Sequence, residues 1–269
     1  MTRQDAIPVS GFRLVPLQRF AQGGRWRTEA MRSYSSPVLY WFTRGQGRIT
    51  VSGVTRGYGP HNAILLPADT MHGFDMMGQV MGVALFFPRD MGGELPEDPI
   101  HLRLRDVQLQ GEMAIQIDNI QRELDLGTDT MPRALLHHAG LLALWIERQA
   151  FPAGHDTDQP DAPAANRIAA AFTALLERDF RKGRGVAHYA AALGVTATHL
   201  SRCCKATSGR TASALLQDRV HFEARQMLRD TRLPIKDVAA TLGFRSAAYF
   251  TRAFQHKTGQ TPSAFRKAD

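Results

Sequence analysis

Short apolar runs separated by turn residues fill the first third of the chain. The runs VLYWFT, RITVSG, NAILLP and VMGVALFF lie within residues 11–90, and the segments RGQG, TRGYGP and PADTMHG separate them. Apolar runs of this length between Gly- and Pro-containing segments are typical of β-strands. Several such strands at short intervals predict a small antiparallel sandwich or barrel.

The apolar pattern changes to a helical period after residue 105. Met113, Ile117, Ile120 and Leu124 recur at steps of three and four residues, which places them on one face of a helix. Residues 132–150 have a similar texture, so the sequence predicts a pair of helices within 106–150. The second of these contains many large apolar residues: Leu135, Leu136, Leu141, Leu142, Leu144, Trp145 and Ile146. They exceed what one helix needs to cover a small β unit, so we expect a homodimer interface here. The alternative, in which the pair only packs on its own β unit, stays open.

A composition shift separates this half of the chain from the next. The segment FPAGHDTDQPDAPAA is rich in Pro, Asp and Ala and lacks an apolar period, so residues 151–164 are predicted to be a linker. After it, helical segments are expected at about 164–181, 185–193, 197–207, 212–229, 235–242, 246–257 and 262–267. The predicted parts are therefore 1–105 (β unit), 106–150 (helical pair), 151–164 (linker) and 165–269 (all-helical domain).

The helical half contains an internal repeat. Residues 190–194 (AAALG) match 239–243 (AATLG), and residues 200–205 (LSRCCK) match 250–255 (FTRAFQ), with offsets of 49 and 50. Each copy predicts a short helix, a turn at Gly194 or Gly243, and a second helix, which together form a helix-turn-helix unit. We expect the small residues Ala191 and Ala240 to let the two helices of each unit approach closely.

Charge supports a nucleic-acid partner for the same half. Residues 162–269 have 18 Lys and Arg against 7 Asp and Glu, a net charge of +11, whereas residues 1–150 have 15 of each sign. A strongly basic domain joined to a neutral one indicates that only the basic domain contacts a polyanion.

Three motifs make the second half similar to the AraC/XylS family of bacterial regulators. They are IKDVAATLGF at 235–244, YFTRAF at 249–254 and GQTPSAFR at 259–266, and the resemblance covers about residues 165–268. It implies seven helices, with two helix-turn-helix units joined by one long helix at about 212–229. It also implies base contacts from Thr198, Ser201 and Arg202 in the first unit, and from Ala247, Ala248, Thr251 and Arg252 in the second.

Residues on the outer faces of the two predicted recognition helices complete the candidate DNA site. Lys205 and Gln255 extend these faces, and Thr196 and Ser246 suit N-caps, whose helix ends also attract phosphate. Arg can pair bidentately with guanine, and Ala can contact a thymine methyl group. Two such helices on one chain can enter successive major grooves, roughly 34 Å apart, and contact an asymmetric site in double-stranded DNA.

The chain departs from the family pattern at two places. Gln255 stands where the family usually has Lys, and Cys203 and Cys204 stand where it usually has large apolar residues. We interpret the two cysteines as small buried hydrophobic residues; a redox-sensing role is the alternative.

The N-terminal half resembles a cupin barrel in one motif, GPHNAILLPADTMH at 59–72, and the family often has such a barrel as its effector domain. Metal-binding cupins also need a His-x-His and a carboxylate, but residues 40–49 contain neither His nor Glu. We therefore expect a non-enzymatic binding module with no metal and no cofactor. A small-molecule effector is expected to contact aromatic and histidine side chains of the barrel: Tyr40, Trp41, Phe42, His61, His72 and Phe74. For His72 the alternative is a structural histidine that is bonded to backbone.

The sequence as a whole predicts an α+β protein with two domains, a cupin-like antiparallel barrel and a double helix-turn-helix domain. The predicted function is sequence-specific DNA binding in transcription regulation, with RNA polymerase as a further candidate partner. The alternatives are a regulator without an effector and a cupin enzyme fused to a DNA-binding domain. The N-terminus has no signal-like apolar core, and the most apolar helical stretch is too short for a membrane span, so we expect a cytoplasmic location.

Overall fold

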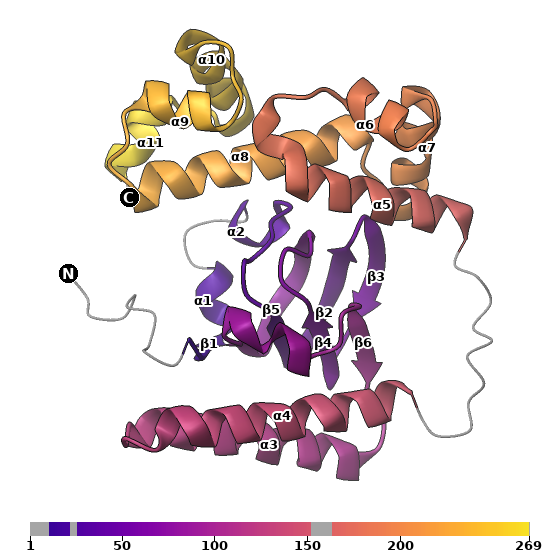
Figure 1. The fold of residues 1–269 in the computed structure, drawn as a ribbon, viewed down its shortest axis with the longest axis vertical. Coiled ribbons are helices and arrows are strands. Elements are labelled where there is room, and N and C mark those ends of the chain that lie inside the picture. Colours follow the sequence, from indigo (N-terminus) through magenta and orange to yellow (C-terminus); the bar gives the residue numbers. More distant parts are fainter. Residues whose placement is uncertain (1–10, 22–25, 152–162, 269) are drawn as a thin grey trace.

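The computed structural model describes residues 11–21, 26–151 and 163–268. Figure 1 shows an antiparallel sheet between a pair of long helices on one side and an all-helical C-terminal domain on the other. The N-terminal elements are β1 (Arg13–Pro16), α1 (Gln18–Ala21), α2 (Trp26–Glu29), β2 (Val38–Val51), β3 (Val54–Tyr58), β4 (Asn62–Leu66), β5 (His72–Phe86), a 3₁₀ helix (Arg89–Glu94), β6 (Ile100–Arg103), α3 (Val107–Leu126) and α4 (Met131–Ala150).

The six strands form one antiparallel sheet in the order β1-β5-β2-β4-β6, and β3 pairs with the second half of β2. The α+β class and the antiparallel strands are therefore confirmed. The sheet is not closed, however, because no pairing joins the end strands β1 and β6 within the described residues, so the expected closed barrel is wrong. Each end strand has only four residues, which leaves little backbone for the staggered pairing that closes a barrel.

The two faces of β2 serve two separate cores, as the alternation of side chains along a strand requires. Leu39 and Trp41 pack toward α3 and α4. Tyr40 and Phe42 point to the other face, where they join Phe74 and further aromatic residues. Both predicted helices of the pair are confirmed, and their inner faces complete the first core.

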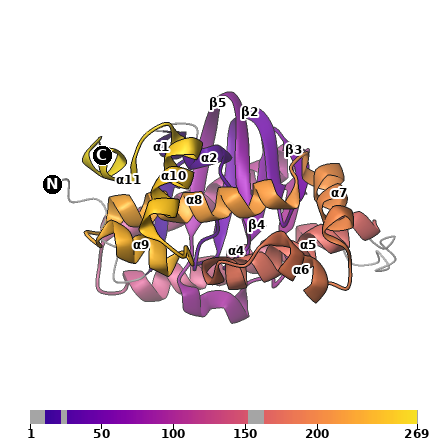
Figure 2. The same ribbon diagram turned by 90° about the horizontal axis from the view of Figure 1, so that it is seen from above.

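The C-terminal domain contains seven α-helices within residues 163–268, as expected, and a short 3₁₀ helix. They are α5 (Ala164–Asp179), η2 (Phe180–Lys182), α6 (Val186–Ala192), α7 (Ala197–Ser208), α8 (Ala212–Asp230), α9 (Ile235–Thr241), α10 (Ala247–Thr258) and α11 (Pro262–Ala268). Figure 2 shows α8 crossing the domain, with α6 and α7 toward one of its ends and α9 to α11 toward the other. Most of the predicted linker, residues 152–162, lies outside the described residues.

The β2–β3 hairpin docks the N-terminal domain onto the C-terminal domain. At its tip, Gly53 has φ +74°, and a Cβ there would lie 3.2 Å from Ala169 Cβ and Thr173 Cγ2 of α5. Thr207 of α7 donates a hydrogen bond of 2.7 Å from its hydroxyl to the Gly53 carbonyl. A glycine is needed here because the backbone is left-handed and a neighbouring helix leaves little room for a side chain.

A buried arginine forms the second docking contact. The Arg219 side chain of α8 is 4% exposed and pairs bidentately with Glu177 of α5, with both N···O distances 2.7 Å. Its guanidinium also donates to Glu223 at 2.9 Å and lies 4.0 Å from the Phe180 ring centroid. The Ser33 hydroxyl of the N-terminal domain donates to Glu177 at 2.6 Å, so this charged cluster extends across the domain boundary.

The two glycine turns of the repeat differ in their surroundings, which gives a matched test. Gly194 and Gly243 have φ +67° and +75°, but a Cβ on Gly194 would meet nothing within 4 Å, whereas a Cβ on Gly243 would lie 2.3 Å from the Gly183 nitrogen. We expect Gly194→Ala to lower the free energy of unfolding by about 1–2 kcal/mol, from backbone strain alone. Gly243→Ala should cost more, because backbone atoms must also move. Urea unfolding of the full chain measures both costs, and equal costs would contradict the contact.

Candidate nucleic-acid interface

Two helix-turn-helix units are present where the repeat predicts them: α6 and α7 with the turn at Gly194, and α9 and α10 with the turn at Gly243. In each unit the residue after the glycine donates its N–H back to the first helix. Val195 N lies 3.0 Å from Ala190 O, and Phe244 N lies 2.9 Å from Ala239 O. The left-handed glycines allow these bonds, which end the first helix and start the turn.

The small buried residues of the units are one position earlier than expected. Ala190 and Ala239 are 1% exposed and lie in the domain core. Ala191 and Ala240, the residues expected to let the helices approach closely, are exposed. The first helices have only seven residues each, so the apolar period of either helix leaves its rotation uncertain by one residue.

Helix α7 presents the predicted contact residues on its outer face. Leu200, Cys203 and Cys204 are buried on the inner side. The outer residues Thr198, Ser201, Arg202 and Lys205 are exposed or half-exposed. The Thr196 hydroxyl caps the helix by accepting from His199 N, as expected of an N-cap. The Arg202 guanidinium contacts His199 Nδ1 at 2.9 Å, which holds its side chain along the outer face.

Helix α10 has the same arrangement in the second unit. Phe250 and Phe254 are buried, and the Ser246 hydroxyl accepts from Tyr249 N as the N-cap. The predicted outer residues are all exposed or half-exposed: Ser246, Ala247, Ala248, Thr251, Arg252 and Gln255. The predicted contact residues of both helices are thus accessible, with no described N-terminal element placed over them (Figure 1).

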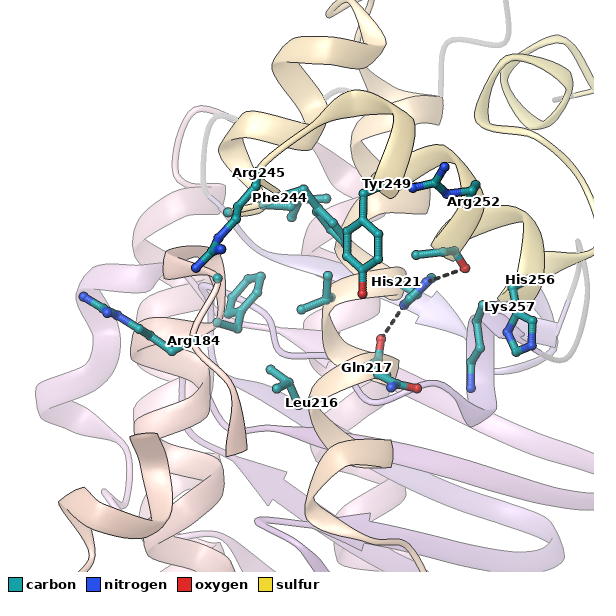
Figure 3. A pocket seen from close by; sticks show the side chains of 16 residues that line it. Arg184, Leu216, Gln217, His221, Phe244, Arg245, Tyr249, Arg252, His256 and Lys257 are labelled. Carbon is teal, nitrogen blue, oxygen red and sulfur yellow. Dashed lines mark hydrogen bonds between the residues drawn. The ribbon is translucent and has the colours of Figure 1, made fainter. Parts of the chain in front are cut away.

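A groove of about 1030 Å³ lies over the first half of α8, beside α10. Its apolar floor includes Phe180, Leu216, Val220, Leu242 and Phe244. Figure 3 shows cationic side chains around this floor, and the charged and aromatic residues that line it are Arg184, Arg245, Tyr249, Arg252, His256 and Lys257. Such a combination suits a sugar-phosphate backbone, because phosphate oxygens accept hydrogen bonds from cationic side chains and apolar surface can face the sugars.

His221 lies in the floor of this groove. Its Nδ1 is 2.8 Å from Gln217 O and its Nε2 is 3.3 Å from Ala253 O, so the ring joins α8 to α10 (Figure 3). Burial lowers the pKa of His221, so the ring is neutral near pH 7 and its single N–H donates to one of these two carbonyl oxygens at a time. His221 is therefore a structural contact between the long helix and the second recognition helix.

Arg184, Arg245 and Lys257 line the groove but are not among the residues that the sequence predicts for DNA contact. Arg184 precedes α6 and Arg245 precedes α10, so neither lies on the outer face of a recognition helix. Basic residues next to helix N-termini, where phosphate is favoured, were the available signal for both. Their placement beside one groove depends on how the two units pack, which the local pattern does not contain.

The two adjacent cysteines occupy core positions, as expected of small buried hydrophobic residues. Both are buried, and burial raises the pKa of the Cys204 thiol to about 11. That thiol is protonated at neutral pH and so a poor nucleophile. Cys203 Sγ lies 3.6 Å from His199 Nε2 on the same helix.

The residues predicted to contact an effector lie in packed cores rather than around an open cavity. Tyr40, Phe42, Phe74 and His72 are at most 3% exposed and pack against one another. The Tyr40 hydroxyl lies 2.9 Å from His72 Nε2, and His72 Nδ1 lies 2.8 Å from Thr70 O. Burial lowers the pKa of His72 to about 3, so the ring is neutral, donates from Nδ1 to the carbonyl and accepts from Tyr40. This is the structural, backbone-bonded role that the sequence left open.

Trp41 and His61 are on the opposite face of the sheet from those four residues. Trp41 belongs to the core under α3 and α4, and the two ring centroids are 5.6 Å apart. The six residues therefore do not converge on one site in this conformation. Their role in effector binding stays a prediction.

Two cavities instead lie where the domains meet. One, of about 690 Å³, is polar and lies beside the Arg219 cluster. The other, of about 470 Å³, lies between the sheet and the first turns of α5, and its lining is mostly apolar with Arg56, His101 and Asn166 among its polar residues. Within the described residues no group of three or more His, Cys, Asp and Glu side chains is placed to hold a metal ion. In the same ranges, no helix has the length and apolar character of a membrane span.

Comparison with known proteins assigns the C-terminal half. Residues 189–268 match the family model described as a helix-turn-helix domain. The HTH-type transcriptional regulator YfiF of Bacillus subtilis is 39% identical over 72 residues, which are 27% of this chain and 23% of that protein. The right origin-binding protein of Escherichia coli K12 is 35% identical over 79 residues, 29% of this chain and 27% of that protein. Residues 189–268 are therefore similar to the helix-turn-helix domains of these regulators.

The family match concerns the DNA-binding domain. The bifunctional transcriptional activator/DNA repair enzyme AdaA of Bacillus subtilis, 40% identical over 70 residues, shares only 33% of its length and 26% of this chain. The chain thus spans about a quarter to a third of the length of these curated relatives. Among solved structures, ToxT of Vibrio cholerae O395 aligns over 95% of this chain and 96% of its own, with 12% identity and a TM-score of 0.41.

Arg202 and Arg252 occupy the same position in the two copies of the repeat, so we predict that each contacts bases in one half of the DNA site. Replacing either arginine with Ala should weaken binding to the preferred site by about 1–3 kcal/mol and relax the preference at one base pair. Binding competition against duplexes with single substitutions measures both effects. Arg122→Ala, on the exposed face of α3 at the opposite end of the molecule, is the control and should change neither. An equal loss on random DNA would show that the arginines contact only phosphates.

Proposed function

We propose that the protein is a sequence-specific DNA-binding transcription regulator. The proposal rests on the pair of helix-turn-helix units. The predicted contact face of each recognition helix is exposed, and the opposite face is buried in the core of the domain. The net charge of +11 on residues 162–269 supports a polyanionic partner. Acting on a chromosome together with RNA polymerase, it would work in the cytoplasm.

The test of this function is selection of DNA by the full chain. A random-core duplex pool, enriched on the purified protein, should yield an asymmetric site with two conserved blocks about one helical turn apart, present once for each copy of the chain that binds. Mapping of bound sites in the source genome should then recover the same sequence upstream of genes. A protein that retains random duplexes equally well would refute sequence-specific binding.

We further propose that the groove binds the phosphate backbone between the two half-sites. Arg184 and Arg245 border the groove but lie outside the recognition helices (Figure 3). Arg184→Ala and Arg245→Ala should each weaken binding to all duplexes and lower the slope of log affinity against log salt by about 1. Base preference should stay unchanged. A slope equal to that of the wild type would contradict the phosphate role.

The α4 helix supports a homodimer as the working form. Leu136, Leu141 and Leu144 of α4 are 47%, 58% and 49% exposed. The helix lies on the side of the sheet away from the DNA-binding domain (Figure 1). Adjacent exposed leucines of this kind mark interaction surfaces. The two copies would then each present two helix-turn-helix units.

Charged substitutions on α4 test the dimer. The full chain should be dimeric in light scattering at micromolar concentration, and the variant with both Leu141→Lys and Leu144→Lys should be monomeric because the substitutions place like charges opposite each other. Val107→Lys is the control, because Val107 is 78% exposed at the start of α3 and is not part of helix α4. A wild-type monomer, or a dimer that survives both substitutions, would exclude this surface.

We also propose that a small molecule modulates DNA binding through the N-terminal domain. A ligand in the cavity of about 470 Å³ would contact strands β2, β3, β4 and β6 together with α5, and so both domains at once. Its volume is within the range of small-molecule sites. A thermal-shift screen of metabolites with the full chain discriminates this from a regulator that has no effector. Bound metal that survives dialysis would instead favour the fused-enzyme alternative.

A further inference from the structure

One carboxylate on the long helix contacts both helix-turn-helix units. Asp218 of α8 pairs through Oδ2 with Arg210, in the turn that follows the first recognition helix α7. Its other oxygen, Oδ1, lies 2.9 Å from Nζ of Lys257, in the last turn of the second recognition helix α10. The Asp218 side chain is only 13% exposed, so both ion pairs form in a partly desolvated place. We call Arg210, Asp218 and Lys257 the Asp218 bridge.

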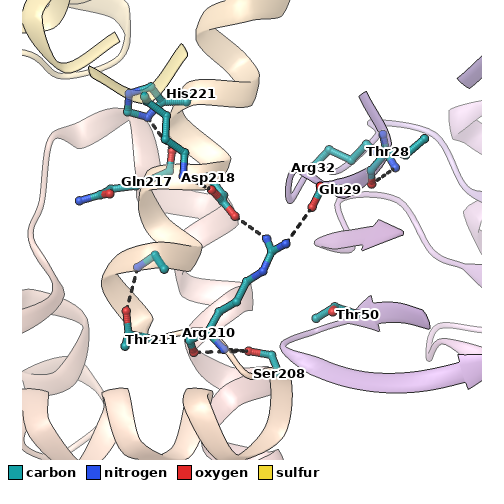
Figure 4. Close-up of polar contacts among 12 residues, drawn as sticks. Thr28, Glu29, Arg32, Thr50, Ser208, Arg210, Thr211, Gln217, Asp218 and His221 are labelled. Carbon is teal, nitrogen blue, oxygen red and sulfur yellow. Dashed lines mark hydrogen bonds and ion pairs between the residues drawn. The ribbon is translucent and has the colours of Figure 1, made fainter. Parts of the chain in front are cut away.

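The N-terminal domain is joined to the same bridge. Arg210 Nη2 donates to the backbone carbonyl of Glu29, 3.3 Å away, while its Nη1 contacts Asp218 (Figure 4). Three residues earlier, Thr207 donates to the Gly53 carbonyl at 2.7 Å. The segment between α7 and α8 therefore contacts the N-terminal domain twice, through Thr207 and through Arg210. Arg210 is also a member of the Asp218 bridge.

The two terminal nitrogens of the Arg210 guanidinium allow it to contact Asp218 and Glu29 at the same time. Its guanidinium has separate N–H groups in a fixed plane, so one group can serve the carboxylate of α8 and another the carbonyl of the N-terminal domain. The turn itself is fixed by Ser208, whose hydroxyl donates to Cys204 O at 2.8 Å and accepts from Arg210 N at 3.3 Å. Because the turn is fixed in this way, a shift of Glu29 relative to α8 would move the Arg210 side chain and alter its contact with Asp218.

We propose that Arg210 and Asp218 are positioning residues that set the separation of the two recognition helices, and that docking of the N-terminal domain holds them in place. This inference rests on the proposed DNA-binding function. Neither residue lies on the outer face of α7 or α10, so both act through the helices they join. The N-terminal domain would then influence DNA binding by stiffening the spacing between half-sites.

If these residues set the separation of the recognition helices, their loss should let the protein accept altered distances between the two conserved blocks. Its affinity for each block alone should not fall. The full chain is tested on the duplex that it selects from a random-core pool, and on the same duplex with one base pair added or removed between its two conserved blocks. Asp218→Asn should reduce the preference for the native spacing about three- to tenfold, as expected for loss of partly buried ion pairs. Affinity for a duplex with only one block should stay the same.

Matched variants separate positioning from folding. Asp230→Asn removes a carboxylate from the end of the same helix, where it pairs with the neighbouring Arg229 in an exposed place, and should leave the spacing preference unchanged. Asp218→Glu keeps the charge and should restore most of the preference. Thr207→Val removes one docking bond without touching the bridge and should relax spacing in the same direction as Asp218→Asn.

Each outcome has a distinct meaning. If the chain selects no duplex, the proposed function fails. If it selects one but Asp218→Asn keeps the wild-type spacing preference, the bridge does not position the helices. If Asp218→Asn relaxes spacing and Thr207→Val does not, the contribution of the N-terminal domain is overturned. A loss of affinity for single-block duplexes equal to that for the complete site would show a general folding defect and would also overturn the positioning role.

Discussion

The pairing of Arg219 with Glu177 is the interaction on which the assembly of this molecule depends. A guanidinium that is 4% exposed needs hydrogen-bonded counter-charges, and Glu177 and Glu223 supply them from α5 and α8. Because Glu177 also accepts from Ser33, the pair that joins the first helix of the DNA-binding domain to its long helix is shared with the N-terminal domain. Removal of either partner would leave a buried charge without its main counter-charge, so domain docking and the helical core are stabilised together.

The helix-turn-helix units could be predicted from the sequence because their determinants are local. Left-handed glycines, N-caps and an apolar period act within one or two turns, and Gly194, Thr196 and their counterparts in the second copy have the roles that their positions indicate. One detail within these units was wrong: Ala190 is buried, where Ala191 was expected to be. The difference is a rotation of the seven-residue helix α6 by one position. So short an element gives a weak helical period, and the contact with its neighbours decides which alanine is buried.

The features that escaped prediction depend on residues far apart in the chain. Gly243 and Gly183 touch through their backbones, Arg210 reaches Glu29, and the groove beside α10 exists only once these contacts are made. The open sheet has the same origin. The apolar runs predicted β2, β4 and β5 but not β1, β3 or β6, and residues 44–47, expected in a turn, lie within β2. Closure depends on the length and register of end strands that are separated by most of the domain.

The docked arrangement limits how the N-terminal domain can influence DNA binding. The hairpin tip at Gly53 contacts Thr207 on the inner side of α7, whereas Thr198 and Arg202 face away and are exposed. This contact therefore leaves the predicted DNA-contacting face of α7 uncovered. A ligand can shift the protein only toward the state that it binds better, so it must distinguish docked from undocked domains. In the proposed positioning role, undocking would remove the contacts of Thr207 and Arg210 that support the α7–α8 turn. A ligand would then act on the geometry of the two recognition helices rather than on their accessibility.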